Sequence, residues 1–178
     1  MSRTVYILLF RGVGGATQLP VKPLREKLTE AGFVNVATYI NSGNVVLATN
    51  KSRAQMLSAV ANLCKAEFGF DKDIHAPSLS EWNEVIANRP FDVSEGKFLH
   101  AAWLGAKPSD ENIERLAALA TNGDGFAVIG NAAYLHTPNG FSSSRLAERF
   151  DKWIGVPNSA RNWNSVLKLR ELAEKADS

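Results

Sequence analysis

Apolar residues follow two alternating spacings along this chain, and the order of those spacings predicts the fold. Thr4–Phe10 is an apolar, partly β-branched run that is typical of a buried central strand. Apolar residues at helical spacing follow a glycine-rich loop, and Gly32 is placed to end that helix. Two short strands, Val36–Ile40 and Val45–Thr49, then flank Asn41–Asn44, whose Gly-Asn pair indicates a hairpin.

A second amphipathic helix and a short strand complete this first half. Ser52 and Gln55 have the spacing of a capping box, in which each side chain accepts a hydrogen bond from the other residue's N–H. The apolar stripe continues until Gly69, and Asp73–Ala76 is predicted as a short strand. The resulting order is β-α-β-β-α-β, which is the ferredoxin-like pattern.

The same order then resumes in the second half. A short helix begins at a capping box formed by Ser78 and Glu81, and Pro90 prevents it from continuing. The predicted elements that follow are a strand at Phe98–Leu104, a helix capped by Ser109, strands at Phe126–Ile129 and Ala133–Thr137 around Gly130-Asn131, a helix after Ser142–Ser144, and a last helix within 159–172.

We therefore predict an α+β protein of two packed ferredoxin-like (βαββα) halves related by an internal duplication. The two hairpins share the motifs GNVVLAT and GNAAYLHT. In this prediction the second half ends in a helix where the first half has a strand. Residues 1–78 form the first half, 79–96 a connecting helix and loop, and 97–178 the second half with a C-terminal helix, packed as one globule.

Composition and charge exclude several classes of protein. The chain is 45% hydrophobic and 21% charged, as in an ordinary globular protein. A net charge of +2 gives no strong attraction to nucleic acid or to anionic membranes. The single cysteine, Cys64, allows no intrachain disulfide. Because the apolar run before Arg11 is too short for a signal peptide or a membrane span, we expect a cytoplasmic protein without membrane association.

The predicted topology brings one set of polar residues together. In a ferredoxin-like unit the first two strands run parallel, so the end of the first lies beside the turn that leaves the second. Arg11 should therefore lie near Asn41, Ser42 and Asn44. An arginine suits a carboxylate or a phosphate, although a loop arginine and turn asparagines are also explained by structural roles alone.

A second polar set lies in SARNWNSVLKLREL, residues 159–172. Asn162 is a good N-cap whose side chain can accept a hydrogen bond from the N–H of Ser165. The cap does not explain the adjacent Arg161, Trp163 and Asn164, and a helix N-terminus with such neighbours is a candidate anion site. The candidate ligand-binding residues are thus Arg11, Asn41, Ser42, Asn44, Arg161, Asn162, Trp163 and Asn164.

The other candidate motifs in the chain do not match the functional signatures that they resemble. The glycines after the first strand match neither a dinucleotide fingerprint nor a Walker A loop. The third strand has no aromatic residue with which to stack bases, so RNA recognition of that kind is disfavoured. His75, His100 and His136 fall in separate strands without metal-ligand spacing, and Cys64 lies on an apolar stripe where packing explains it. We expect no cofactor and no metal.

Three motifs are shared with a known family: RG…VGG…LP near the start, TYINSGNVVL in the first hairpin, and ARNWNSVLKL near the end. With these, the chain resembles the bacterial domain-of-unknown-function family 1697 from about residue 4 to residue 172. It lacks two residues that members usually carry after Arg11-Gly12, and it has 142-SSSRL-146 where they have Gly-Arg-Ser-Lys-Leu. The resemblance implies an α+β fold of ferredoxin-like halves and brings no established activity.

The leading hypothesis is a binding module or an enzyme of unassigned reaction for a small anionic or nucleotide-like ligand. The arginines would pair with the anion, the amides would orient it, and Trp163 would supply a wall or stacking surface. Two alternatives remain: a protein-protein interaction or homo-oligomerisation domain, and weak nucleic-acid binding through Arg145, Arg149, Lys152 and Lys168. Nucleic acid is the least favoured partner, and an oligomer is compatible with the sequence.

Overall fold

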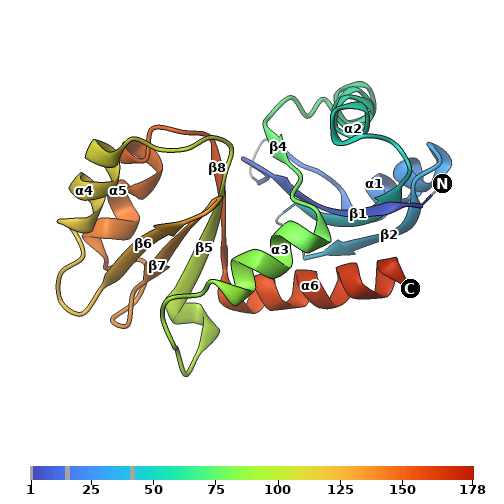
Figure 1. Ribbon diagram of the computed structural model, residues 1–178. Coiled ribbons are helices and arrows are strands. Elements are labelled where there is room, and N and C mark those ends of the chain that lie inside the picture. Colours follow the sequence, from blue (N-terminus) through green and yellow to red (C-terminus); the bar gives the residue numbers. More distant parts are fainter. Residues whose placement is uncertain (1, 15–16, 41–42) are drawn as a thin grey trace. The chain divides into compact units, whose positions relative to one another are not determined.

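The computed structural model describes residues 2–14, 17–40 and 43–178, and these form a mixed α+β fold (Figure 1). They contain two four-stranded antiparallel sheets and six α-helices. The chain divides into two compact units, the first comprising residues up to Trp82 together with Leu169–Ser178, and the second comprising Asn83–Lys168. The boundaries predicted at 78 and 96 stay a prediction.

The first unit contains one sheet with two helices packed on it, and also the start of α3 (Leu79–Ala87) and the C-terminal part of α6 (Trp163–Asp177). The sheet and its two helices are formed by β1 (Thr4–Phe10), α1 (Val21–Glu30), β2 (Val34–Tyr39), β3 (Asn44–Thr49), α2 (Arg53–Phe68) and β4 (Ile74–His75). The strands are ordered β2-β3-β1-β4, so β1 lies between two neighbours and six of its seven residues are buried.

The core of this unit packs alternate residues of β1 against both helices. Tyr6, Leu8 and Phe10 share one face of the strand, and they form one cluster with Leu28 of α1 and Val60 of α2. The apolar positions in the two helices are spaced three or four residues apart, as an amphipathic helix on a sheet requires. The apolar stripe that the sequence predicts on each helix is therefore the surface that contacts the sheet.

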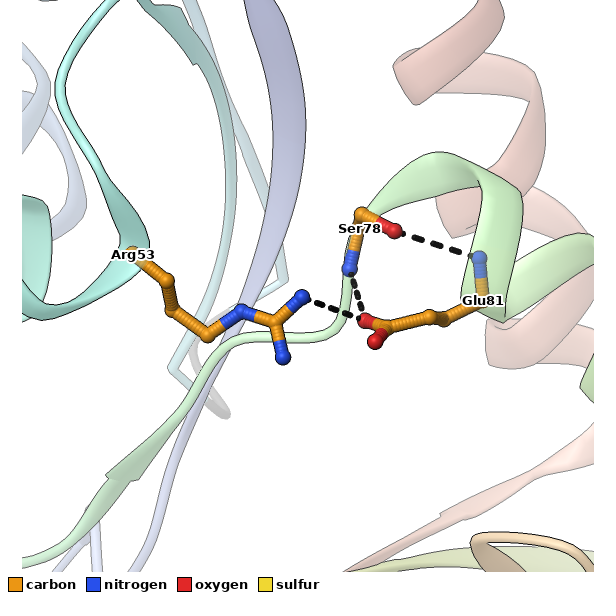
Figure 2. Close-up of polar contacts among 3 residues, drawn as sticks. All are labelled: Arg53, Ser78 and Glu81. Atoms are coloured by element: carbon orange, nitrogen blue, oxygen red, sulfur yellow. Dashed lines mark hydrogen bonds and ion pairs between the residues drawn. The ribbon is translucent and has the colours of Figure 1, made fainter.

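Both predicted capping boxes of this unit are present. Ser52 Oγ accepts from Gln55 N at 3.2 Å, and Gln55 Oε1 accepts from Ser52 N at 3.0 Å. At the start of α3 (Leu79–Ala87), Ser78 N donates to Glu81 Oε2 at 2.8 Å and Glu81 N donates to Ser78 Oγ at 3.2 Å (Figure 2). Arg53 of α2 donates to the same Glu81 oxygen at 2.8 Å, which joins the starts of the two helices.

The second unit repeats the order of elements. After the short 3-10 helix η1 (Gly96–Phe98) come β5 (Leu99–Leu104), α4 (Asp110–Ala117), β6 (Gly125–Ile129), β7 (Ala132–His136), α5 (Arg145–Trp153), β8 (Asn158–Asn162) and α6 (Trp163–Asp177). The strands are ordered β6-β7-β5-β8. Leu104 and Leu135 pack with Leu116 of α4 and with Leu146 and Phe150 of α5, so both helices cover one face of this sheet.

The prediction that this half ends in a helix without a fourth strand is wrong. Asn158–Asn162 pairs with β5 from Leu104↔Asn158 to His100↔Asn162, and α6 begins only at Trp163. The strand lies at the edge of its sheet, where one side of its backbone has no strand neighbour and polar side chains are common. The polar sequence NSARN therefore lacks the hydrophobic alternation by which a strand is recognised.

Among the described residues, no helix is both long enough and apolar enough to cross a membrane.

Candidate functional site

Three segments of the first unit meet where β1 ends. Leu9 pairs with Asn44, and Phe10 N donates to Gly43 O at 2.9 Å. A Cβ added to Gly43, whose φ is +77°, would lie 2.7 Å from Val13 Cγ2. The loop that follows β1 therefore touches the hairpin between β2 and β3, and glycine is required at the contact.

The third segment is the entry to β4, which carries a second cation. Arg11 N donates to Asp73 O at 3.0 Å. The aliphatic part of Lys72 passes over Gly12, since a Cβ there would lie 3.6 Å from Lys72 Cγ. Two cationic residues therefore belong to this place, the half-buried Arg11, which precedes Gly12 in the chain, and the exposed Lys72, whose side chain lies over Gly12.

The backbone of this loop offers donors as well. Gly14 N donates to Thr17 O at 2.6 Å, and Thr17 N donates to Gly14 O at 2.9 Å, which closes the loop. Among the described residues, the N–H groups of Gly12 and Val13 have no hydrogen-bond partner. Gly12 has a φ of +68°, a conformation in which successive N–H groups can converge on an anion.

Asn44 is the one hairpin residue of the candidate set that the structure describes. Asn44 is 1% exposed, and its Nδ2 donates to Tyr39 O at 3.2 Å, so it ties the hairpin together. Asn41 and Ser42 lie outside the described residues. Among the described residues of this half of the set, Arg11 is the cationic one, and its role as a ligand contact stays a prediction.

The other half of the set belongs to the second unit. Ser165 N donates to Asn162 Oδ1 at 3.0 Å, which confirms the predicted N-cap. Arg161 precedes it in β8, so the two side chains leave opposite faces of the sheet. Arg161 is half-buried, and its Nη1 donates to Ala160 O at 2.9 Å.

The last two candidates of this half pack against their own unit. Trp163 is 3% exposed, and the Arg89 guanidinium lies 5.7 Å from the centroid of its ring. Its predicted role as a wall or stacking surface for a ligand stays a prediction. Asn164 is exposed, and its amide oxygen lies where a Cβ on Gly96 would be. The convergence of both halves on one ligand stays a prediction.

The remaining titratable candidates have structural explanations. Burial raises the pKa of the Cys64 thiol to about 12, so it carries no thiolate at neutral pH, which agrees with the predicted packing role. His75, His100 and His136 lie in β4, β5 and β7, as the sequence indicated. No group of three or more His, Cys, Asp or Glu residues in the described part of the chain could hold a metal ion.

Sequence reasoning missed Lys72 altogether. The residue is exposed and lies just before a strand of two residues, so the sequence around it contains no motif that indicates a binding site. The signal that could have found it is topological, because the fourth strand of such a unit pairs with the first. β4 does pair with the end of β1, through Leu9↔His75 and Phe10↔Ile74.

These observations define a mixed α+β protein built on two four-stranded antiparallel sheets, with a cationic loop at the end of the first sheet. Residues 3–134 match the family described as "Protein of unknown function (DUF1697)", and the chain belongs to that family. A solved structure, that of the conserved bacterial protein SP0830 from Streptococcus pneumoniae, is 21% identical and has a TM-score of 0.77. The match covers 97% of this chain and 99% of that protein, and at this identity it shows a shared fold. No curated protein matches the chain.

Proposed function

We propose that this protein binds a small anionic ligand, with a phosphate or carboxylate group held at the loop that follows β1. The observation that carries the proposal is that the Lys72 side chain lies over Gly12, the residue that follows Arg11 in the chain. The N–H groups of Gly12 and Val13 add two neutral donors at the same place. A guanidinium, an ammonium and converging amides are the donors that phosphate and carboxylate ligands use in proteins.

Thermal unfolding in the presence of inorganic phosphate and of adenosine 5′-monophosphate tests this proposal. A ligand at ten times its Kd stabilises the native state by about 1.4 kcal/mol. For a chain of this size, that raises the unfolding midpoint by about 3–6 °C. Arg11→Ala and Lys72→Ala should each reduce the rise without unfolding the protein.

The matched control is Arg25→Ala. Arg25 is an exposed arginine of the same unit, on α1, and its Nη1 donates to Thr38 Oγ1 at 3.1 Å. The change removes the same charge from α1, outside the loop that follows β1. If Arg25→Ala reduces the rise as much as Arg11→Ala does, or if neither compound raises the midpoint of the native protein, the proposal fails.

We also propose that each sheet with its two helices is a ferredoxin-like unit, and that the chain arose by internal duplication. What supports this is the strand order, which is β2-β3-β1-β4 in one unit and β6-β7-β5-β8 in the other. The element order supports it too, once β8 is counted as the counterpart of β4. If the two sheets are superposed in an experimental structure and α4 and α5 then coincide with α1 and α2, the proposal is supported. Helices on the opposite face would refute it.

A further inference from the structure

One outer edge of the second sheet is formed by β6, whose sequence is GFAVI (Figure 1). All five of its residues are partly exposed, none is charged and none is proline. An edge strand presents a row of backbone N–H and C=O groups that can pair with a strand of another molecule. Proteins usually block such an edge with a charge, a proline, a bulge or a very short strand.

The three other sheet edges each carry such a block. β2 has a register shift after Val34, where its pairing with β3 is irregular. β4 has two residues, and β8 contains the charged Arg161. β6 pairs with β7 along its whole length without a register shift. Of the four edges that the structure describes, β6 is therefore the one best suited to receive another strand.

The hydrogen bonds around β7 show which backbone groups of β6 point outward. Thr137, just after β7, donates its N–H to Phe98 O at 2.8 Å, so the odd-numbered residues of this stretch bond toward β5. The even-numbered residues bond to β6, where their partners are Gly125, Ala127 and Ile129. The N–H and C=O groups of Phe126 and Val128 are therefore on the outer side. No described residue forms a hydrogen bond with them there.

The sequence of β6 is complementary to a second copy of itself. In an antiparallel pair with a two-fold axis at Ala127, Phe126 lies opposite Val128 of the partner subunit, and each such pair exchanges two hydrogen bonds. An aromatic residue opposite a β-branched residue is a favourable cross-strand pair. Ala127 lies opposite its own copy at the axis. Because the strand is uncharged, no like charges face each other along it.

The helix next to this edge presents a matching apolar flank. α4 contacts both β6 and α5. Arg115 lies over Trp153 of α5, with 4.4 Å from the guanidinium carbon to the ring centroid, so this residue marks the flank of α4 that faces α5. The partly exposed Ile113 and the exposed Ala117 lie on the opposite flank, because two residues turn a helix by about 200°. A second copy of α4 can pack against that flank when the strands pair.

We propose that β6 is a homodimer interface, at which two copies of this chain pair antiparallel through the backbone of Phe126 and Val128. The second sheets of the two copies then form one continuous sheet, and the two α4 helices lie side by side on it. Each copy contributes one strand and one helix flank. Because such an interface is smaller than the standard size, the dimer is weak and its population depends on protein concentration.

Sedimentation velocity of the full chain between about 5 µM and about 500 µM tests the proposal, since this range covers weak association. The mass should rise from that of the 19.4 kDa monomer toward twice that value as the concentration increases. A chain that stays monomeric at about 500 µM would overturn the proposal.

Amide hydrogen exchange at the two ends of this concentration range locates the interface. The N–H groups of Phe126 and Val128 should exchange at least about three-fold more slowly once the dimer is the main species, because each then has an acceptor. A dimer in which these two N–H groups exchange as fast as in the monomer would refute β6 as the interface.

Two adjacent alanines of α4 give a matched pair of variants. Ala117→Glu adds a charge to the flank at the edge, where an antiparallel copy also brings Asp110 of the partner subunit, and should weaken the dimer at least about ten-fold. Ala118→Glu adds the same charge at an exposed residue two positions from the buried Leu116, hence on the side away from the sheet. It should change the Kd by less than about two-fold. Equal effects of the two variants would contradict the proposed arrangement.

A proline tests the strand pairing itself. Val128→Pro removes an outward N–H of β6 and leaves the hydrogen bonds to β7 in place, as edge strands tolerate. It should abolish the dimer while the variant still unfolds cooperatively, and an unchanged Kd would rule the pairing out. Arg11→Ala should leave the dimer unchanged, because that residue belongs to the first unit. The dimer and the anion site can therefore fail separately.

Discussion

Acid should destabilise the second unit through His100. This residue lies in β5, and its ring stacks on Phe141 with 3.9 Å between the two ring centroids. Its Nδ1 is buried and has no hydrogen-bond partner among the described residues. Burial lowers the pKa of His100 from 6.5 to about 4, because the charged imidazolium loses its hydration in the folded protein. At neutral pH the folded protein therefore holds this ring uncharged.

The sign and size of the effect follow from that pKa. Between pH 6.5 and pH 4 the unfolded chain binds a proton at this histidine and the folded protein does not. Stability is therefore fully present above pH 6.5 and is lost as the pH falls through this window. With these two values, the loss in the free energy of unfolding reaches about 2 kcal/mol at pH 5 and about 3 kcal/mol at pH 4.

Urea unfolding of the native protein and of His100→Leu at pH 7, 6, 5 and 4 measures this loss. The variant lacks the proton-binding group, so the difference between the two curves should grow as the pH falls. Phe141→Ala is the second comparison, since it exposes the ring and should make the pH dependence of the native protein shallower. Parallel pH dependence of the native protein and His100→Leu would refute the reasoning.

Three further outcomes follow from single contacts. Glu81→Ala removes the carboxylate that accepts from Ser78 N, and should lower the free energy of unfolding by about 1 kcal/mol in urea titrations; an unchanged midpoint would contradict the capping role. Gly43→Ala places a Cβ 2.8 Å from Phe10 Cβ at a φ of +77°, and should destabilise by at least about 1 kcal/mol; a stabilised variant would show that the contact is wrong. Cys64 should not react with a thiol reagent in the native protein and should react in urea, because it is buried; prompt native labelling would refute this.

The elements that the sequence predicted well are those with local signals. β1 was predicted with the bounds that the structure has, because a central strand is apolar on both faces. The capping box at Ser52 was recognised because it depends on residues three positions apart. β8 was missed because the hydrogen bonds that hold NSARN come from β5, more than fifty residues earlier.

The candidate site could likewise be predicted only in part. Topology predicted that Arg11 would lie near the hairpin, and the contact between Val13 and Gly43 puts the two loops together. The interpretation of residues 161–164 as ligand contacts started from an N-cap at Asn162, which the structure has, but it did not recognise that Arg161 and Asn162 end a strand.

A titration of the isotope-labelled protein with inorganic phosphate, followed by amide NMR shifts, tests the central claim most directly. The account predicts that the amide signals of Gly12 and Val13 move in a saturable way, and that Arg11→Ala abolishes the movement. Amide signals in this loop that stay fixed at saturating phosphate would contradict it, whatever moves elsewhere in the protein.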